Sequence, residues 1–323
     1  MKSLRALALL FVATASAANA QAPGDFPTRP VKFLVPFAAG GPTDVVTRIL
    51  ADLLSAHWGG QSVVVENRPG AGTILATAAV AKAPADGYTL LFGTNSIFIN
   101  PAIGQKLPYD TLKELSGVSM LATQPVALVA SNAFAPNTVA ELVALAKRSP
   151  EPINFTSPGP RGVGHLSGAM LTQRAGIKMV HVNYNGSAPA LVDVIAGRVP
   201  IMFDIWHSAK RYIGSGGLKL IASASAQRFS DALQVPTLSE TYPGFAVAAV
   251  NIVYGPAGIP APVLEKLSAD IRAVVDSKGF AEKVAPLGID AKGSTPQEVD
   301  AFTRAEIARW AEVAKAAGIK ADD

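Results

Sequence analysis

The sequence predicts an α/β protein in which helices cover mostly parallel sheets. Short apolar runs alternate along the chain with segments whose apolar residues recur at helical spacing. The apolar runs are rich in Val, Ile, Leu and Phe, as in strands that are buried on both faces of a sheet. This alternation is typical of strands joined by crossover helices.

Each predicted element follows from one of these two patterns. Strands are expected at 31–35, 62–66, 89–92, 117–121, 126–130, 153–156, 180–184, 200–203, 218–223 and 251–254. Helices are expected between them, at 44–56, 72–82, 138–147, 165–175, 187–197, 262–276, 279–286 and 296–317. The last three helices follow a turn, and we expect them to pack back on the first sheet of a chain that crosses twice between two domains.

The N-terminus has the pattern of a secretory signal peptide. Lys2 and Arg5 form a short basic start, Leu7–Val12 is an apolar core, and Ala18–Ala20 is a small-residue cleavage motif. The apolar core is shorter than the roughly 20 residues that span a bilayer. We therefore expect cleavage before Gln21 and export of a soluble mature chain.

Composition narrows the classes of function. The chain has 323 residues, which by size fits two domains, and it has no cysteine, which excludes disulfides and thiol catalysis. The formal charge is only +4, without the Lys/Arg runs that nucleic-acid binders carry. We expect no nucleic-acid partner, and the basic balance slightly favours an anionic ligand.

The segment VKFLVPFAAGGPTDVVTRIL combines a buried strand, a glycine turn and a helix start. Gly40 and Gly41 allow backbone conformations that other residues resist. Thr43 and Asp44 are residues of the type that caps helices. A helix start presents free N–H groups and the positive end of the helix dipole. The segment therefore predicts an anion site.

Four further loops lie between a predicted strand and the following helix. They are Asn67–Gly72, Gly93–Ser96, Ser157–Gly164 and Tyr184–Ser187. Ligands of open α/β sheets bind at the carboxyl ends of the strands, where these loops lie. Each loop alone is compatible with an ordinary surface loop, and their joint occurrence favours a binding site.

Two charged residues near these loops leave alternatives open. Arg161 lies in a Gly/Pro loop, where it is either solvated or clamps a carboxylate through two parallel hydrogen bonds. Asp204 ends an apolar run, where it accepts a hydrogen bond from a ligand or a water, or caps a local turn.

The motifs of catalysis are missing. The four histidines have no metal-ligand spacing, and neither a nucleophile elbow nor a P-loop occurs. Glu66 ends a strand as a ribose-binding acid would, but Gly70–Gly72 follows it, whereas the dinucleotide fingerprint places its glycines before the acid. We expect no cofactor, no metal and no catalytic residue.

Long stretches of the chain carry a family resemblance. They include FPTRPVKFLVPFAAGGPTDVVTRILA, VVENRPGAGTILATAAVAKAPADGYTLL, SPGPRGVGHLSG, NYNGSAPALVDVIAGRVPIMFD, QVPTLSE, GPAGIP and RWAEVAKAAGIKAD. In these the chain resembles the Bug-type periplasmic solute receptors, the extracytoplasmic binding proteins of tripartite tricarboxylate transporters. The resemblance covers essentially the whole mature chain.

This resemblance implies a two-lobed type II periplasmic binding protein fold with a ligand cleft between the lobes. Residues 1–20 would be the signal peptide, residues 25–125 with 250–323 the first lobe, and residues 126–249 the second. The family holds carboxylates largely through backbone N–H groups and waters at two loops, which match Phe37–Asp44 and Ser157–His165 here.

The resemblance also implies a function and a set of binding residues. The protein would be a monomer that captures a di- or aromatic carboxylate for the membrane subunits of a transporter. The alternatives are a sensor that feeds a membrane-bound regulator and an exported dinucleotide-dependent enzyme. The predicted ligand-binding residues are Phe37, Ala39, Gly40, Gly41, Thr43, Asp44, Thr94, Asn95, Ser157, Arg161, Gly162, Tyr184 and Asp204.

Two departures from the family pattern lie near the expected cleft. The second loop carries Pro160–Gly164 where members often have a Gly/Asn/Ser-rich sequence, so a direct contact from Arg161 would replace a backbone or water contact. Asn185 stands where many members carry Lys, which removes a charge. Ligand choice is therefore not transferable from a relative.

Overall fold

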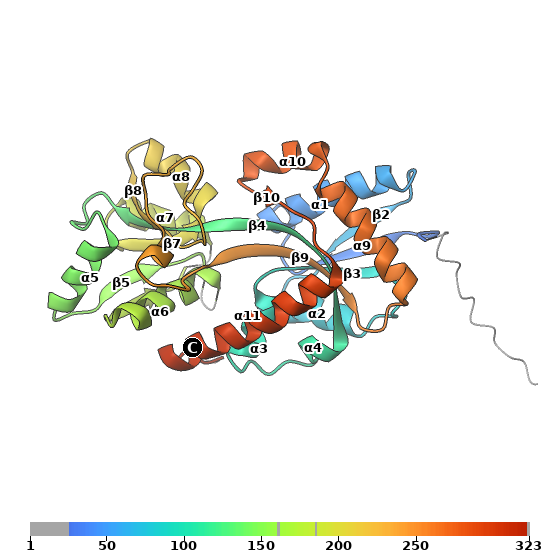
Figure 1. Cartoon of the computed structure of the whole chain (residues 1–323), viewed down its shortest axis with the longest axis horizontal. Helices are drawn as coiled ribbons and strands as arrows, with labels where there is room; N and C mark the ends of the chain where they lie inside the picture. The colour runs from blue at the N-terminus through green and yellow to red at the C-terminus, as the bar shows by residue number, and fades with distance from the viewer. Residues whose placement is uncertain (1–25, 160–161, 185, 322–323) are drawn as a thin grey trace, which may run out of the picture.

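Two α/β lobes lie side by side along the long axis of the molecule (Figure 1). The computed structural model describes residues 26–159, 162–184 and 186–321. The predicted signal peptide and its cleavage site lie outside these residues, as do Arg161 and Asn185.

The sheet of the first lobe has the strand order β2-β1-β3-β9-β4, and β10 pairs with β4. The strands β1, β2 and β3 are parallel, whereas β9 runs antiparallel between β3 and β4. The bounds are β1 (Val31–Val35), β2 (Val63–Asn67), β3 (Thr89–Gly93), β4 (Leu115–Ser131), β9 (Ala248–Pro256) and β10 (Asp290–Ala291).

The sheet of the second lobe repeats this order as β6-β5-β7-β4-β8. Here β5, β6 and β7 are parallel, and β4 is the antiparallel strand between β7 and β8. The bounds are β5 (Ile153–Thr156), β6 (Met179–Val182), β7 (Ile201–Ile205) and β8 (Leu218–Ser223). Each lobe thus takes one reversed strand from the chain that crosses between them, which confirms the predicted two-lobed α/β fold with mostly parallel strands.

The long strand β4 differs from the sequence prediction of two strands. Residues 115–125 pair with β9 of the first lobe, and residues 126–131 pair with β7 and β8 of the second. The apolar pattern breaks at Thr123–Pro125, which lie where the strand passes from one lobe to the other. Gln124 Nε2 there donates a hydrogen bond of 3.2 Å to Asn251 Oδ1 on β9. The break in the pattern therefore marks the crossing and not the end of a strand.

Helices cover both faces of the sheets. The first lobe contains α1 (Pro42–His57), η2 (Ala71–Thr73), α2 (Ile74–Ala81), α3 (Ser96–Ala102), α4 (Thr111–Glu114), α9 (Ala261–Val275), α10 (Lys278–Val284) and η4 (Ala285–Leu287). The second contains α5 (Val139–Arg148), α6 (Val163–Ala175), α7 (Ser187–Ile195), α8 (Trp206–Gly214) and η3 (Leu238–Glu240). The helices α3, α4 and α8 were not predicted from the sequence. In α8, Ala209 is buried, and Trp206, Tyr212 and Ile213 are partly buried against the same apolar cluster.

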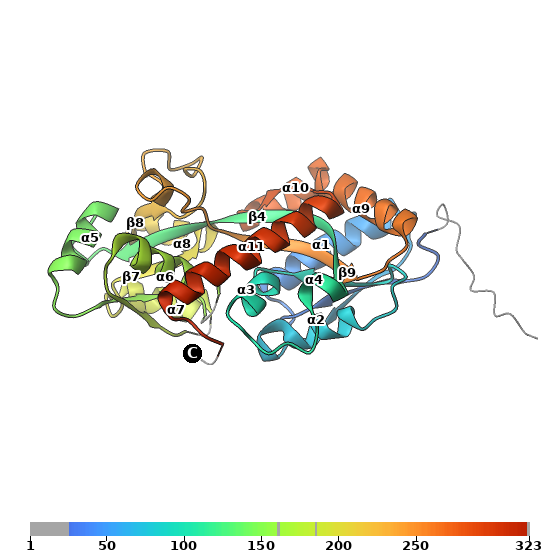
Figure 2. The same cartoon turned by 60° about the horizontal axis from the view of Figure 1, so that its bottom comes forward.

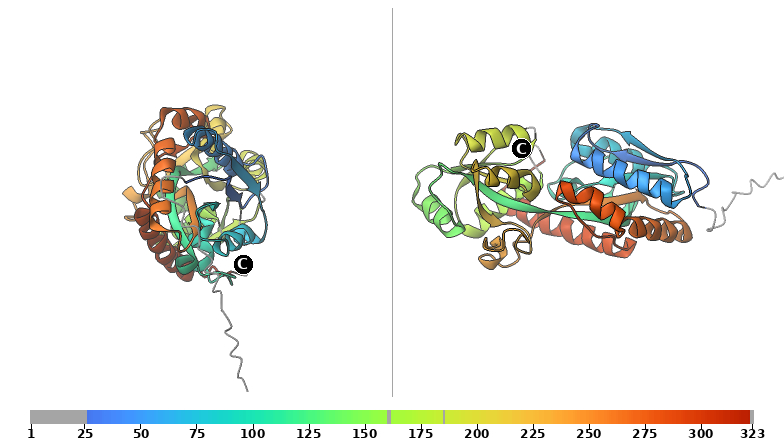
Figure 3. Two further views of the ribbon diagram at one scale, coloured as in Figure 1. Left: turned by 90° about the vertical axis from the view of Figure 1, so that its right-hand side faces the viewer. Right: turned by 90° about the horizontal axis from the view of Figure 1, so that it is seen from above.

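The last helix, α11 (Pro296–Ala317), runs along both lobes, as Figure 2 and the view from above in Figure 3 show. It begins with a capping box of Thr295 and Glu298. It packs against α3 and β4, and also against α6 of the second lobe. Its buried Trp310 and Val313 share one apolar cluster with residues of both lobes. The prediction that this helix packs on the first sheet was therefore too narrow.

Within the described residues, no helix combines the length and the apolar character that crossing a bilayer requires.

Candidate ligand cleft

A cleft of about 1070 Å³ lies between the lobes and receives residues from all five loops that the sequence singled out. The first lobe contributes residues 37–43, 71–74 and 94–96, and the second contributes Pro158, Gly159, residues 162–164, Gly186, Ser187 and residues 203–205. Side chains and backbone at the crossing strands, including Gln124, Val126 and Asn251, also line it. The loops come together because each lies at the carboxyl end of a strand, on the side of the sheet that faces the other lobe.

The start of α1 presents bare backbone to the cleft. Its N-cap residue, Gly41, has no side chain to satisfy the first N–H groups. Gly40 before it has φ +81°, a left-handed conformation that favours glycine. Within the described residues, no hydrogen bond engages the N–H of Gly41 or Thr43. Both residues line the cleft, so these donors and the helix dipole are available to an anion.

The Asp44 side chain holds the loop before α1 through hydrogen bonds. The residue is 2% exposed and is not part of the cleft lining. It accepts hydrogen bonds from Gly40 N at 2.8 Å, from Asn67 Nδ2 at 2.9 Å and from Arg48 Nε at 3.0 Å. The hydrogen bond from Arg48, with those from Gly40 and Asn67, lowers the pKa of Asp44 to about 2 although burial opposes the shift. The Asp44 side chain thus holds the loop in place and does not line the cleft.

The start of α6 in the second lobe has the same construction. Its N-cap residue is Gly162, again with no side-chain cap, and its extended φ of −82° and ψ of 173° resemble the −76° and 166° of Gly41. Gly164 lies so close to the end of β7 that a Cβ atom would approach the Phe203 carbonyl oxygen to 2.7 Å. The helix start is therefore seated on the sheet, with Gly162–Gly164 lining the cleft.

The structure separates the other predicted residues into two groups. Phe37, Ala39, Thr94 and Asn95 line the cleft. The Asn95 amide, however, binds the start of β9, since Nδ2 donates to the Ala248 carbonyl at 2.9 Å and Oδ1 accepts from Val250 N at 3.0 Å.

Ser157 and Tyr184 do not belong to the cleft lining. Ser157 Oγ donates to the Gly159 carbonyl at 2.8 Å and lies 2.8 Å from His181 Nε2. Tyr184 Oη donates to Asp193 Oδ2 at 2.5 Å. Both side chains therefore form hydrogen bonds within the second lobe. Arg161 lies outside the described residues.

Asp204 lies near the carboxyl end of β7 and lines the cleft from the second lobe, with 1% of its surface exposed. Its Oδ1 accepts hydrogen bonds from Ser187 Oγ at 2.9 Å and from Ile205 N at 2.8 Å. Its Oδ2 is buried without a partner among the described residues. Burial raises the pKa of Asp204 to about 6, against the smaller opposing effect of these hydrogen bonds. These hydrogen bonds join Asp204 to the hydroxyl of the first residue of α7 and to the next residue of the chain, and they are not a side-chain cap of α7.

The raised pKa of Asp204 predicts a pH-dependent stability. A carboxyl group whose folded-state pKa lies above its unfolded value stabilises the fold fully below about pH 4, and this stabilisation is lost as pH rises through about 6. Asp204→Asn, which removes the charge, is expected to raise the free energy of unfolding by about 1–3 kcal/mol at pH 8 and to change it little at pH 4. Urea unfolding of both proteins at the two pH values measures this, and an equal effect at both would contradict it.

Several polar groups of the cleft were not predicted. They include Thr73, Ser96, Gln124 and Asn251. Ser96 lies in the same predicted loop as Thr94, so its position in that loop was the available signal. Gln124 and Asn251 lie on crossing strands, whose meeting in space has no local sequence signal.

The described residues that line the cleft include no Lys and no Arg. They also contain no group of three or more His, Asp or Glu side chains that could hold a metal ion, and none occurs elsewhere in the described chain. Attraction for an anion within this part of the cleft therefore comes from backbone N–H groups, hydroxyls and helix starts.

Two type II α/β lobes with a cleft lined by helix starts define a class of proteins that bind solutes. The model of the "Tripartite tricarboxylate transporter family receptor" matches residues 46–319. The chain belongs to this family. Membership implies a periplasmic location.

The relatives agree with this assignment. Protein BugT of Bordetella pertussis is 33% identical, with 99% of each chain covered. A structure from R. palustris with adipate is 34% identical, with 92% of this chain and 99% of that chain covered and a TM-score of 0.79. MatC from Rhodopseudomonas palustris with bound malate is 30% identical, with 89% and 99% covered and a TM-score of 0.75. The family and these neighbours are solute-binding proteins, so the chain is not an enzyme and the dinucleotide alternative is wrong.

Proposed function

We propose that this protein, as a monomer, captures a small di- or aromatic carboxylate in the cleft and delivers it to the membrane subunits of a tripartite tricarboxylate transporter. The observation that carries the proposal is the pair of uncapped helix starts. Gly41 of α1 and Gly162 of α6 come from opposite lobes and line one cavity. The adipate and malate bound in two relatives support a carboxylate ligand.

The energetics require both helix starts. An exposed helix start contributes roughly 0.3–1 kcal/mol to an anion interaction, and up to about 2 kcal/mol when partly buried. A micromolar ligand needs about −8 kcal/mol in total. One helix start cannot supply this, so closure of the lobes must bring the N–H groups of both onto the same ligand.

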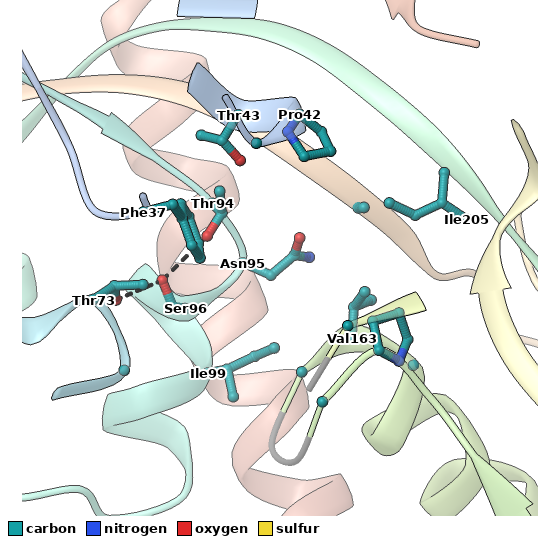
Figure 4. A pocket seen from close by; sticks show the side chains of 18 of the residues that line it. Phe37, Pro42, Thr43, Thr73, Thr94, Asn95, Ser96, Ile99, Val163 and Ile205 are labelled. Carbon is teal, nitrogen blue, oxygen red and sulfur yellow. Dashed lines mark hydrogen bonds between the residues drawn. The ribbon is translucent and has the colours of Figure 1, made fainter. Parts of the chain in front are cut away.

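The remaining walls suit a carbon skeleton. Figure 4 shows Ile99 near the lower part of the pocket, with Val163 and Ile205 on the side of the second lobe and Phe37 on the side of the first. Burying apolar ligand surface against such side chains contributes roughly 25 cal/mol per Å². A ligand with an aliphatic or aromatic body and ionised ends would therefore use both kinds of wall.

A thermal-shift panel followed by calorimetry tests the proposal. The panel pairs each carboxylic acid with its neutral amide, such as adipate with adipamide and benzoate with benzamide. We expect at least one acid to raise the melting temperature while its amide does not. Stabilisation by neutral sugars or amines and by no acid would overturn the proposal.

Arg161→Ala is expected to weaken the affinity for a stabilising acid at least tenfold. The prediction rests on the sequence, because a guanidinium in this loop can clamp a carboxylate through two parallel hydrogen bonds. Arg161→Lys is the matched control, since it keeps the charge but not the planar pair of donors, and an intermediate loss is expected. Calorimetry measures all three proteins. Unchanged affinity in Arg161→Ala would show that Arg161 is solvated and does not contact the ligand.

A further inference from the structure

A backbone outlier lies at the edge of the cleft. Ala71, Gly72 and Thr73 follow one another in the left-handed region, with φ of 47°, 60° and 82°. Glycine adopts this conformation without strain, whereas a β-branched residue such as threonine is rarely found there. Strain of this kind persists only where neighbouring structure enforces it, and it collects at functional sites.

Neighbouring helices enforce the conformation of this segment. Thr77 Oγ1 on α2 donates to the Thr73 carbonyl at 3.0 Å. From α3, Asn100 Nδ2 donates to the Gly72 carbonyl at 3.1 Å, and Ser96 Oγ accepts a hydrogen bond of 2.8 Å from Thr73 Oγ1. Thr73 is 7% exposed. Its side chain is therefore held against the start of α3, where the next loop of the cleft ends.

Three hydroxyl groups form a chain at this place. Thr73 Oγ1 donates to Ser96 Oγ, which lies 3.2 Å from Thr94 Oγ1 (Figure 4). The three groups carry three hydrogens, and their two mutual hydrogen bonds use two of them. One hydrogen, on Ser96 or Thr94, is left over. Both of these residues are half-buried and line the cleft, so the remaining donor is accessible from it.

We propose that Thr73, Ser96 and Thr94 form a hydroxyl subsite that donates its remaining hydrogen to a carboxylate oxygen of the ligand, with Thr73 as the positioning residue. This inference rests on the proposed carboxylate-binding function and adds a side-chain donor to the backbone donors of the two helix starts. The hydrogen bond from Thr73 occupies an acceptor site of Ser96 and so turns the hydrogen of the chain toward Thr94 or the cleft. A donor chain polarised in this way strengthens its last hydrogen bond to an anion.

Two substitutions at Thr73 separate the hydroxyl from the backbone. Thr73→Gly removes the hydroxyl and relieves the left-handed strain, and Thr73→Ser keeps the hydroxyl. Calorimetry with adipate and with malate measures affinity, and thermal unfolding without ligand measures stability. For whichever acid binds the wild-type protein, Thr73→Gly is expected to weaken binding about tenfold while its melting temperature is unchanged or raised. Thr73→Ser is expected to retain the wild-type affinity, and Ser96→Ala to lose about as much as Thr73→Gly.

Two results at Thr73 would contradict the hydroxyl subsite. Wild-type affinity in Thr73→Gly, or the same loss in Thr73→Ser, would overturn the hydroxyl subsite while leaving the proposed function intact. A wild-type protein that binds neither of these acids, nor any acid of the wider panel, would overturn the proposed function and this inference together.

Discussion

Replacing Asp44 by alanine is expected to lower the free energy of unfolding by about 2–4 kcal/mol at pH 7 and to weaken ligand capture at least tenfold. The substitution leaves the Gly40 N–H, the Asn67 amide and Arg48 without their shared acceptor. Hydrogen bonds to a charged group contribute roughly 1.5–3 kcal/mol each, and Arg48 recovers part of the loss through water. Capture weakens because the α1 loop is no longer held in its binding conformation before the ligand arrives.

The effect of removing this charge has a defined pH dependence. Since the pKa of Asp44 is lowered to about 2, its contribution is present above about pH 4 and is lost as pH falls through about 2. Asp44→Asn should therefore destabilise the protein at pH 7 and less at pH 3, where part of the contribution of the charge is already lost. Asp52→Asn, the same change at an exposed position of α1, is the matched control and should stay within about 0.5 kcal/mol. Guanidinium unfolding of the three proteins at both pH values measures the difference, and equal losses for Asp44→Asn at both would contradict the role of the charge.

Trp310→Ala is expected to lower the free energy of unfolding by about 3–5 kcal/mol, because a fully buried tryptophan leaves a large cavity. Trp310 lies in the apolar cluster that also contains Phe98 of α3 and Met170 of α6. Its indole Nε1 donates to Glu306 Oε2 at 2.9 Å, and the Arg309 guanidinium lies 4.4 Å from its ring centroid.

The position of α11 adds to this effect. Arg309 also donates to the Ala246 carbonyl, in the segment by which the chain returns to the first lobe. Removing the ring therefore loosens the contact of α11 with both lobes and with this crossing. Glu312→Ala, at an exposed position of the same helix, should change stability by less than about 0.5 kcal/mol. A loss below about 1 kcal/mol for Trp310→Ala in urea unfolding would show that α11 is not a structural bridge.

Local patterns account for what the sequence could predict. The strand, glycine turn and helix around Gly40 and Gly41 are contiguous, so their residue types determine both the conformation and the free N–H groups. The start of α6 at Gly162 is predictable for the same reason. Each depends on side chains within a few residues, whose spacing a sequence displays directly.

Long-range contacts account for what it could not predict. The orientation of Asp44 depends on Asn67, which is 23 positions away and reaches it only because β1 and β2 are paired. The Asn95 amide is engaged by Ala248 and Val250, which no local pattern connects to it. The left-handed conformation of Thr73 runs against the preference of its own residue type, so it is enforced from outside by α3. In each case the determining contact comes from another element of the fold.

The most direct test of carboxylate capture between the two helix starts is an amide NMR titration of the ¹⁵N-labelled protein. The titrants are the acid that gives the largest thermal shift and its neutral amide, and the signals followed are the N–H groups of Thr43 on α1 and Gly164 on α6. We predict large, saturable shifts at both positions with the acid and none with the amide. Saturable binding of the acid that leaves both N–H groups unchanged, or equal shifts with the amide, would contradict capture by these two helix starts.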